Sequence, residues 1–182
     1  MIIFKYARWK NFLSTGNQFI EIQLDKSPTT LIVGENGAGK STILDVLCFG
    51  LFGKPFRGIN KAQLVNSINN SSTIIEIEFT IGTRNYKVVR GIKPNKFEIY
   101  QNDKMMNLEA NVRDYQKILE QQILKLNYRS FTQVVILGSS TFVPFMQLKA
   151  RHRREVVEEI LDIQIFSIMN LLARQKTKEI TE

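Results

Sequence analysis

The chain has 182 residues, of which 43% are hydrophobic, enough for one packed domain with an extension. It has no run of about 18 apolar residues and no secretory signal at its start, so we expect a cytoplasmic protein without membrane contact. Cys48 is the single cysteine and His152 the single histidine, which excludes an internal disulfide and a metal site rich in cysteine or histidine. The net charge of +8 favours an anionic partner.

The first elements are predicted to be β-structure. Residues 2–9 read as a strand, residues 10–17 as a turn, and residues 19–24 as a second strand with apolar residues at every other position. Residues 29–33 (TTLIV) form a short β-branched apolar run, which predicts a buried strand.

A glycine-rich segment follows this run. Residues 34–42 (GENGAGKST) fit the P-loop pattern G-x-x-x-x-G-K-[ST], and helical spacing of apolar residues begins at Ile43. Strand, glycine loop and helix together predict N–H groups that face a polyphosphate. Lys40 would reach the β- and γ-phosphates, and the Ser41 hydroxyl would bind Mg²⁺. The predicted ATP-binding residues are Asn36, Gly37, Ala38, Gly39, Lys40, Ser41 and Thr42, with Gly34 and Glu35 opening the loop. The alternative is a glycine turn that caps a helix and binds nothing.

The middle of the chain predicts a β-rich segment. Residues 73–81 alternate strongly, residues 82–85 turn, and residues 86–90 return as the second strand of a hairpin. A further strand is expected at 97–100, a helix at 111–126, and a buried apolar strand at 132–138.

From residue 148 onward the chain has no glycine or proline and becomes densely charged. A helix over residues 155–182 is predicted from one apolar stripe at helical spacing: Val157, Leu161, Ile165, Ile168 and Leu172. Two interpretations stay open, a helix that packs on its own domain and the root of a coiled coil.

Several motifs, taken in order, resemble the N-terminal half of an SbcC-type, SMC-like ABC ATPase of DNA double-strand-break repair. The segments that carry this family resemblance are residues 10–14 (KNFLS), 34–45, 49–53 (FGLFG), 86–90 (YKVVR) and 131–145. Residues 50–57 (GLFGKPFR) and 134–138 (VVILG) carry a stronger likeness to the large subunits of the T-even phage recombination endonucleases. The resemblance covers nearly the whole chain.

The resemblance implies an α/β fold: a P-loop NTPase of the ABC type, here as an N-terminal lobe with a β-rich subdomain. It implies a lobe over residues 1–150 and an amphipathic helix over residues 151–182 that begins a coiled coil. ATP and Mg²⁺ are the implied cofactors. The implied partners are the C-terminal lobe of the same ATPase, a second head in a homodimer, a nuclease subunit and double-stranded DNA.

The chain departs from the family pattern in several places. It contains no Walker B strand ending in Asp-Glu and no signature motif, so no complete catalytic set is present and we expect near-inactivity of the isolated chain. Ser139 falls where the family has a Mg²⁺-linked glutamine, and a polar turn is an equal alternative. Leu13 fills the place of a basic residue, which leaves Lys10 and Ser14 as candidates near the nucleotide.

Two further basic features have competing interpretations. Arg90 is read as a charge at a strand edge rather than as a functional group. Basic residues cluster before the last helix, with DNA contact, partner contact and solubility left open: Lys149, Arg151, His152, Arg153 and Arg154. The favoured function is an ATP-binding lobe of a DNA repair ATPase that works with a nuclease on DNA ends. The alternatives are a nucleotide-holding interaction module and a small P-loop kinase.

Overall fold

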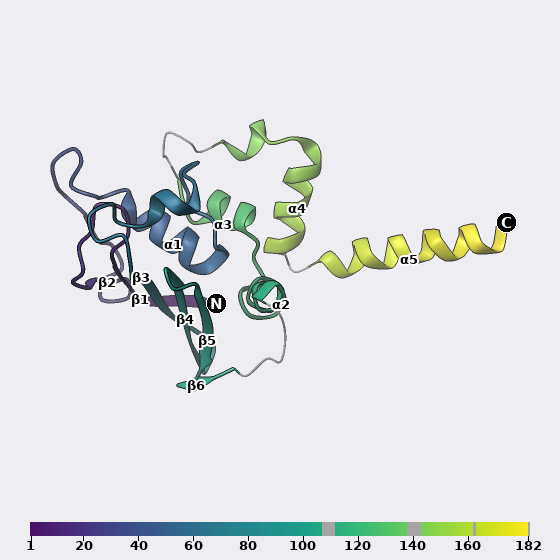
Figure 1. Cartoon of the computed structure of the whole chain (residues 1–182). Helices are drawn as coiled ribbons and strands as arrows, with labels where there is room; N and C mark the ends of the chain where they lie inside the picture. Colours follow the sequence, from purple (N-terminus) through teal and green to yellow (C-terminus); the bar gives the residue numbers. More distant parts are fainter. Residues whose placement is uncertain (107–111, 138–142, 162, 182) are drawn as a thin grey trace. The chain divides into compact units, whose positions relative to one another are not determined.

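Six antiparallel strands organise the first part of the chain (Figure 1). The computed structural model describes residues 1–106, 112–137, 143–161 and 163–181. The strand order in the sheet is β2-β1-β3-β4-β5-β6. Their bounds are β1 Ile2–Lys10, β2 Ile20–Gln23, β3 Thr73–Ile81, β4 Arg84–Ile92, β5 Lys96–Gln101 and β6 Lys104–Met105. The predicted hairpin is therefore confirmed as β3 and β4, with Gly82 turning between them at φ +60°.

The core of this part lies between the sheet and helix α1 (Thr42–Phe52). β3 buries alternate side chains, including Ile75, Ile77 and Phe79, because successive residues of a strand point to opposite faces. Gly50 of α1 faces this strand, and a Cβ there would collide with the Ile77 side chain. The missing side chain thus lets the helix approach the sheet closely.

Arg90 of β4 joins this core and is not the strand-edge charge that the sequence suggests. It is only 9% exposed, and its Nε donates to the carbonyl oxygen of Gly50 at 3.0 Å. Its guanidinium also stacks 3.8 Å from the centre of the Phe97 ring and donates to Gln116 Oε1 at 2.6 Å. A cation at the last carbonyls of α1 suits the negative end of that helix, so Arg90 is a structural residue.

The strand predicted at residues 29–33 is wrong. In the described ranges this segment has no strand partner, and Leu31 and Val33 are 85% and 81% exposed. A β-branched run becomes a strand only when a neighbour completes its hydrogen bonds. The segment therefore presents apolar side chains and unpaired backbone just before the P-loop.

The second compact unit comprises Glu120–Glu182, after Met1–Leu119, and is helical. The predicted helix at 111–126 is present as α2 (Val112–Lys117), which continues as a π-helical turn over Ile118–Leu124.

The strand predicted at 132–138 is wrong, because residues Tyr128–Val134 form helix α3. Asn127 caps α3 by accepting from the Ser130 N–H at 3.0 Å, and this cap together with burial of Phe131 overrides the strand propensity of the sequence.

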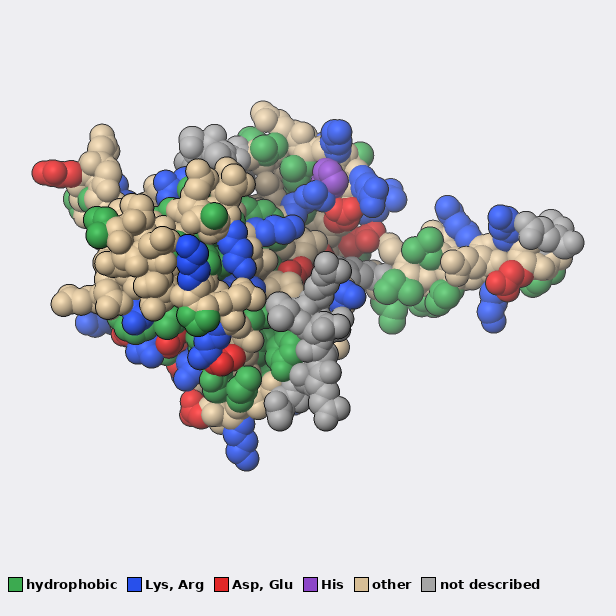
Figure 2. Space-filling view, viewed as in Figure 1, with side chains coloured by type: hydrophobic (Ala, Val, Ile, Leu, Met, Phe, Trp, Pro, Cys, Tyr) green, Lys and Arg blue, Asp and Glu red, His purple; other side chains and the backbone are tan. Residues whose placement is uncertain are grey.

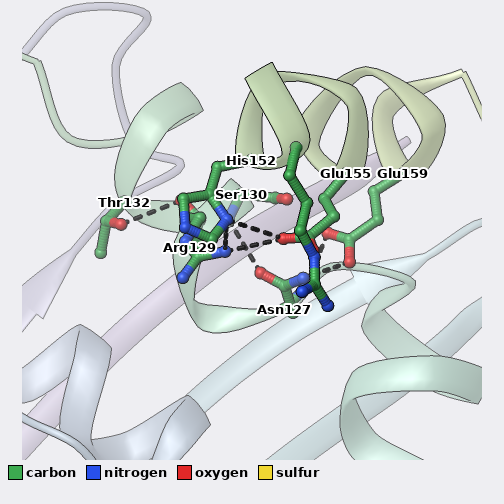
Figure 3. A network of polar contacts seen from close by, with 8 residues as sticks. Asn127, Arg129, Ser130, Thr132, His152, Glu155 and Glu159 are labelled. Carbon is green, nitrogen blue, oxygen red and sulfur yellow. Dashed lines mark hydrogen bonds and ion pairs between the residues drawn. The ribbon is translucent and has the colours of Figure 1, made fainter. Parts of the chain in front are cut away.

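Polar contacts join α3 to α4 (Ala150–Ile160), as Figure 3 shows. Asn127 donates to the Glu159 carboxylate, and Arg129 donates to Glu155 Oε2 at 2.7 Å. The His152 ring lies between Arg129 and Glu155. Burial raises the pKa of Glu155, but hydrogen bonds from His152 and Arg151 and the charge of Arg129 outweigh it, so its pKa lies below the usual value.

The terminal region is two helices and not the single helix predicted. α4 ends at Ile160, and α5 runs over Gln164–Thr181 (Figure 1). Val156 is the buried apolar residue of α4, whereas Val157 is 38% exposed.

The compact units divide after Leu119, while the sequence places a domain boundary after residue 150. The assignment of residues 151–182 to a coiled-coil root stays a prediction. In the described residues no helix has the length and apolar character needed to cross a bilayer.

Candidate functional site

The predicted phosphate loop adopts the backbone that its glycines permit. Gly37 and Gly39 both have φ +90°, a region that residues with a Cβ rarely enter. Within the described chain, the backbone N–H groups of Gly37, Gly39, Lys40 and Ser41 donate to no backbone carbonyl. Donors left open at a glycine loop are suited to an anion.

Helix α1 begins directly after this loop. Ser41 occupies the position before the first helical residue, and its side chain makes no capping hydrogen bond there. Its hydroxyl is therefore available to another ligand. The N-terminus of an eleven-residue helix adds partial positive charge where the loop donors gather.

Lys40 reaches back across the loop. Its ammonium donates to the carbonyl oxygens of Gly34 and Glu35 at 2.6 and 2.7 Å. Both contacts lie at the surface, so the ammonium can exchange these carbonyls for a phosphate without leaving a buried charge.

A cavity of about 360 Å³ opens over the loop. Six of the predicted residues line it: Asn36, Gly37, Gly39, Lys40, Ser41 and, at the helix start, Thr42. Ala38 instead faces a neighbouring apolar cavity that also contacts Gly39 and Lys40. Gly34 and Glu35 stand behind the loop as acceptors for Lys40.

The rest of the cavity lining follows only in part from the sequence. Leu13, Ser14, Arg57 and Ile59 line it. Ser14 was a sequence candidate, but Lys10 lies away from the cavity, with its ammonium 5.2 Å from the centre of the Phe19 ring. Arg57 ends the family-like segment 50–57, and no sequence signal indicates that it lines one cavity with the P-loop.

Arg57 is held by a buried carboxylate. Asp45 of α1 is fully buried; its Oδ1 accepts from the Arg57 backbone N–H at 2.9 Å, and its Oδ2 accepts from Nε at 2.7 Å and Nη2 at 2.5 Å. The Arg57 side chain remains 42% exposed. Asp45 thereby fixes the loop after α1 at the mouth of the cavity.

The remaining predicted residues fall in the second compact unit, Glu120–Glu182. Ser139 lies outside the described residues. In the basic cluster, Arg151 pairs with Glu155 and Arg153 donates to the Met146 carbonyl. Figure 2 shows Lys and Arg side chains gathered around the histidine, which belongs to α4. This arrangement leaves DNA contact, partner contact and solubility open. Across the described ranges, no three His, Cys, Asp or Glu side chains converge as a cation site.

Comparison with known sequences gives the family. The model of a family described as "AAA domain" matches residues 8–182. The chain is 43% identical over 166 residues to "Exonuclease subunit 2" of Enterobacteria phage T4, covering 91% of this chain and 30% of the phage protein. It is 40% identical to the protein of the same name from Escherichia phage RB69, covering 96% of this chain and 31% of that protein.

A cellular relative is more distant. The "Probable DNA double-strand break repair Rad50 ATPase" of Aquifex aeolicus is 27% identical, with 82% of this chain and 16% of that protein covered. The chain thus spans about a third of the length of its phage relatives and less of the cellular one.

Solved structures agree on the fold. An Smc head domain with an extended coiled coil, derived from Pyrococcus furiosus, superposes with a TM-score of 0.63 at 20% identity, covering 98% of this chain and 46% of that chain. An Smc head from Pyrococcus yayanosii gives a TM-score of 0.60 at 21% identity, covering 98% of this chain and 36% of that chain. The resemblance found in the sequence is therefore confirmed: the chain belongs to the AAA domain family, as an N-terminal lobe of the SbcC/Rad50 kind.

Proposed function

We propose that this chain is the ATP- and Mg²⁺-binding N-terminal lobe of an SMC-like ATPase that acts in DNA repair or recombination with a nuclease subunit. The observation that carries the proposal is the glycine loop with φ +90° at Gly37 and Gly39, set at the start of α1 beneath a cavity. Its open N–H groups, the helix N-terminus and Lys40 supply the charge complement of a triphosphate.

The residues present fit a nucleotide with its metal ion. Asn36, Gly37, Ala38, Gly39, Lys40, Ser41 and Thr42 are the proposed ATP-binding residues, with Gly34 and Glu35 opening the loop. Ser41 would hold Mg²⁺ through its hydroxyl, which makes no cap to α1. The bound ion would neutralise phosphate charge, while the loop and Lys40 orient the phosphate chain.

Further lobes and partners are proposed for the longer protein. The exposed apolar segment at residues 31–33 supports a missing strand partner, for which the C-terminal lobe of the same ATPase is the proposed source. The exposed apolar residues of α5, such as Ile165 and Leu172, support pairing with a returning coiled-coil helix. A nuclease subunit and double-stranded DNA are proposed as partners from the relatives' names and from the net charge of +8, and a second head in a homodimer is proposed from the family resemblance.

Replacing Lys40 by alanine tests the nucleotide assignment. Because the ammonium is exposed and contacts only loop carbonyls, we expect Lys40→Ala to lower the affinity for Mg²⁺–ATP by at least about tenfold while leaving thermal unfolding within a few degrees. Lys26→Ala, which removes the same charge from an exposed loop residue, is the control and should bind as the parent chain does. Equal affinities in all three proteins would contradict the proposal.

A further inference from the structure

Part of the cavity wall outside the P-loop is formed by a strained turn. Leu13 and Ser14 line the cavity, and Leu13 has φ +54°, a left-handed conformation that costs a branched side chain about 1–2 kcal/mol. Such a backbone persists only when neighbouring residues hold it in place.

Asn66 holds both sides of Ser14. Its side-chain Nδ2 donates to the carbonyl oxygen of Leu13 at 3.0 Å and to that of Thr15 at 3.1 Å. Asn66 is 5% exposed and lies on a loop that is about fifty residues away along the chain. One buried amide therefore fixes the peptide group that precedes Ser14 and the peptide group that follows Thr15.

The orientation of this amide is determined by its partners. Its Oδ1 accepts from the backbone N–H groups of Ile68 and Asn69, both at 3.0 Å. A flipped amide would turn its donors toward two N–H groups and its acceptor toward two carbonyls. Because all four contacts are satisfied in only one orientation, Asn66 acts as a rigid bracket.

The backbone around the bracket is fixed as well. The Leu13 N–H donates to the Leu64 carbonyl at 2.7 Å, and the Asn66 N–H donates to the Asn11 carbonyl at 2.9 Å. Phe12 pairs with Val65 as an isolated antiparallel bridge. The turn and the Asn66 loop thus form one unit, in which Asn69 Nδ2 also donates to Asn11 Oδ1 at 2.7 Å, and the Asn66 amide is the side-chain link that contacts the carbonyls of Leu13 and Thr15.

The position of this wall indicates which part of a ligand it meets. The P-loop and the N-terminus of α1 form one side of the cavity and are suited to phosphates. Leu13 and Ile59 are its apolar lining and are suited to a nucleoside rather than to phosphate oxygens.

We propose that Asn66 is a positioning residue for nucleotide binding, which holds Leu13 and Ser14 against the nucleoside part of the ligand. The inference rests on the proposed function. It goes beyond that function because it predicts that a substitution of Asn66 weakens only the contribution of the nucleoside to the binding affinity and leaves phosphate binding unchanged.

The test compares two ligands on the 182-residue chain. Mg²⁺–AMP-PNP presents nucleoside and phosphates, and Mg²⁺–tripolyphosphate presents phosphates alone. The parent chain should bind AMP-PNP more tightly. Asn66→Asp replaces two donors by a carboxylate facing two carbonyls, and we expect about a tenfold loss of AMP-PNP affinity with tripolyphosphate affinity unchanged within about twofold.

Controls separate this role from general stability. Asn70→Asp makes the same chemical change four residues away, on an exposed side chain whose Oδ1 accepts from Lys93, and should leave both affinities unchanged. Asn66→Ala removes the bracket without adding charge, so it serves if Asn66→Asp does not fold, and it should show the same selective loss.

Two results would overturn the inference. The first is equal affinity of the parent chain for the two ligands. The second is an unchanged ratio of the two affinities in folded Asn66→Ala, and if both affinities fall by the same factor, Asn66 is a structural residue only. Failure of the parent chain to bind tripolyphosphate would instead contradict the proposed function.

Discussion

The Asp45 carboxylate accepts hydrogen bonds from both the backbone N–H and the guanidinium of Arg57, although twelve residues separate the two. The carboxylate lies fully buried in α1, yet its arginine partner is 42% exposed at the cavity mouth. The pair therefore holds Arg57, a residue of the cavity lining, against helix α1. Removing the charge should affect both stability and the geometry of the loop.

We predict that Asp45→Asn lowers the free energy of unfolding by about 1–3 kcal/mol, because the amide places donors against the Arg57 guanidinium inside the protein. Urea unfolding measures this. Glu98→Gln makes the same change in the more exposed pair with Lys96, in which the Lys96 side chain is 43% exposed and the Glu98 side chain 18%, and should cost less than about 1 kcal/mol. Equal effects of the two substitutions would show that the buried pair contributes no more than the more exposed one.

The P-loop backbone gives a second prediction. Gly39→Ala places a Cβ at φ +90°, so the loop must change conformation, and we expect at least about a tenfold loss of Mg²⁺–ATP affinity. Gly82→Ala imposes a similar strain at φ +60° in the β3–β4 turn, with open space around the new methyl. It should lower stability but leave affinity unchanged. Calorimetric titration with Mg²⁺–ATP measures the affinity of both variants. A loss of affinity in Gly82→Ala would show that strain at either glycine weakens binding through the stability of the whole fold.

Cys48 provides a prediction about pH. Burial, with a smaller contribution from the Asp45 charge, raises the pKa of its thiol to about 12, above the ordinary value of 9.0. Between these values the unfolded chain loses a proton that the folded chain keeps. Its contribution to stability is therefore complete below pH 9 and falls by up to about 1.4 kcal/mol per pH unit above it.

Urea unfolding of the parent chain and of Cys48→Ala at pH 8, 9 and 10 measures this contribution. All other titrating groups are common to both proteins, so the difference between their slopes isolates the thiol. Parallel pH profiles would mean that Cys48 titrates alike in both states.

Hydrolysis should be very slow in this chain alone. The sequence supplies a phosphate cradle and one Mg²⁺ ligand but no Walker B acid, so we expect turnover far below the common enzymatic range of about 1–10³ s⁻¹. Steady-state phosphate release measures it, with Lys40→Ala as the background control. Turnover within that range, abolished by Lys40→Ala, would favour a stand-alone enzyme.

The last helix should be weakly protected from hydrogen exchange. Ile165, Ile168 and Leu172 of α5 are each more than half exposed, and a lone helix of this length is marginal in water. We expect fast exchange beyond Ile168 in a monomer, or self-association that covers the apolar residues. Strong protection through Lys178 in a monomer, shown by sedimentation, would contradict the coiled-coil prediction.

Local patterns predicted those elements whose partners lie nearby in sequence. The alternation in residues 73–81 and the turn at Gly82 predicted β3 and β4, because adjacent strands of a hairpin pair with each other. Helix α1 follows from apolar spacing, and the glycine pattern predicted a phosphate loop, in which Gly37 and Gly39 have positive φ angles. The sequence by itself therefore determined the phosphate loop, its helix and the family.

Only the tertiary structure decided the rest. Residues 29–33 and 132–138 carry similar strand-forming runs, yet the first has no partner among the described residues and the second lies partly in a capped helix. Asp45, Arg57 and Asn66 carry no periodic signal, since each acts through a partner distant in the chain. Their roles depend on which loops the packing of α1 and the sheet brings to one cavity, and burial and hydrogen-bond geometry fix that arrangement.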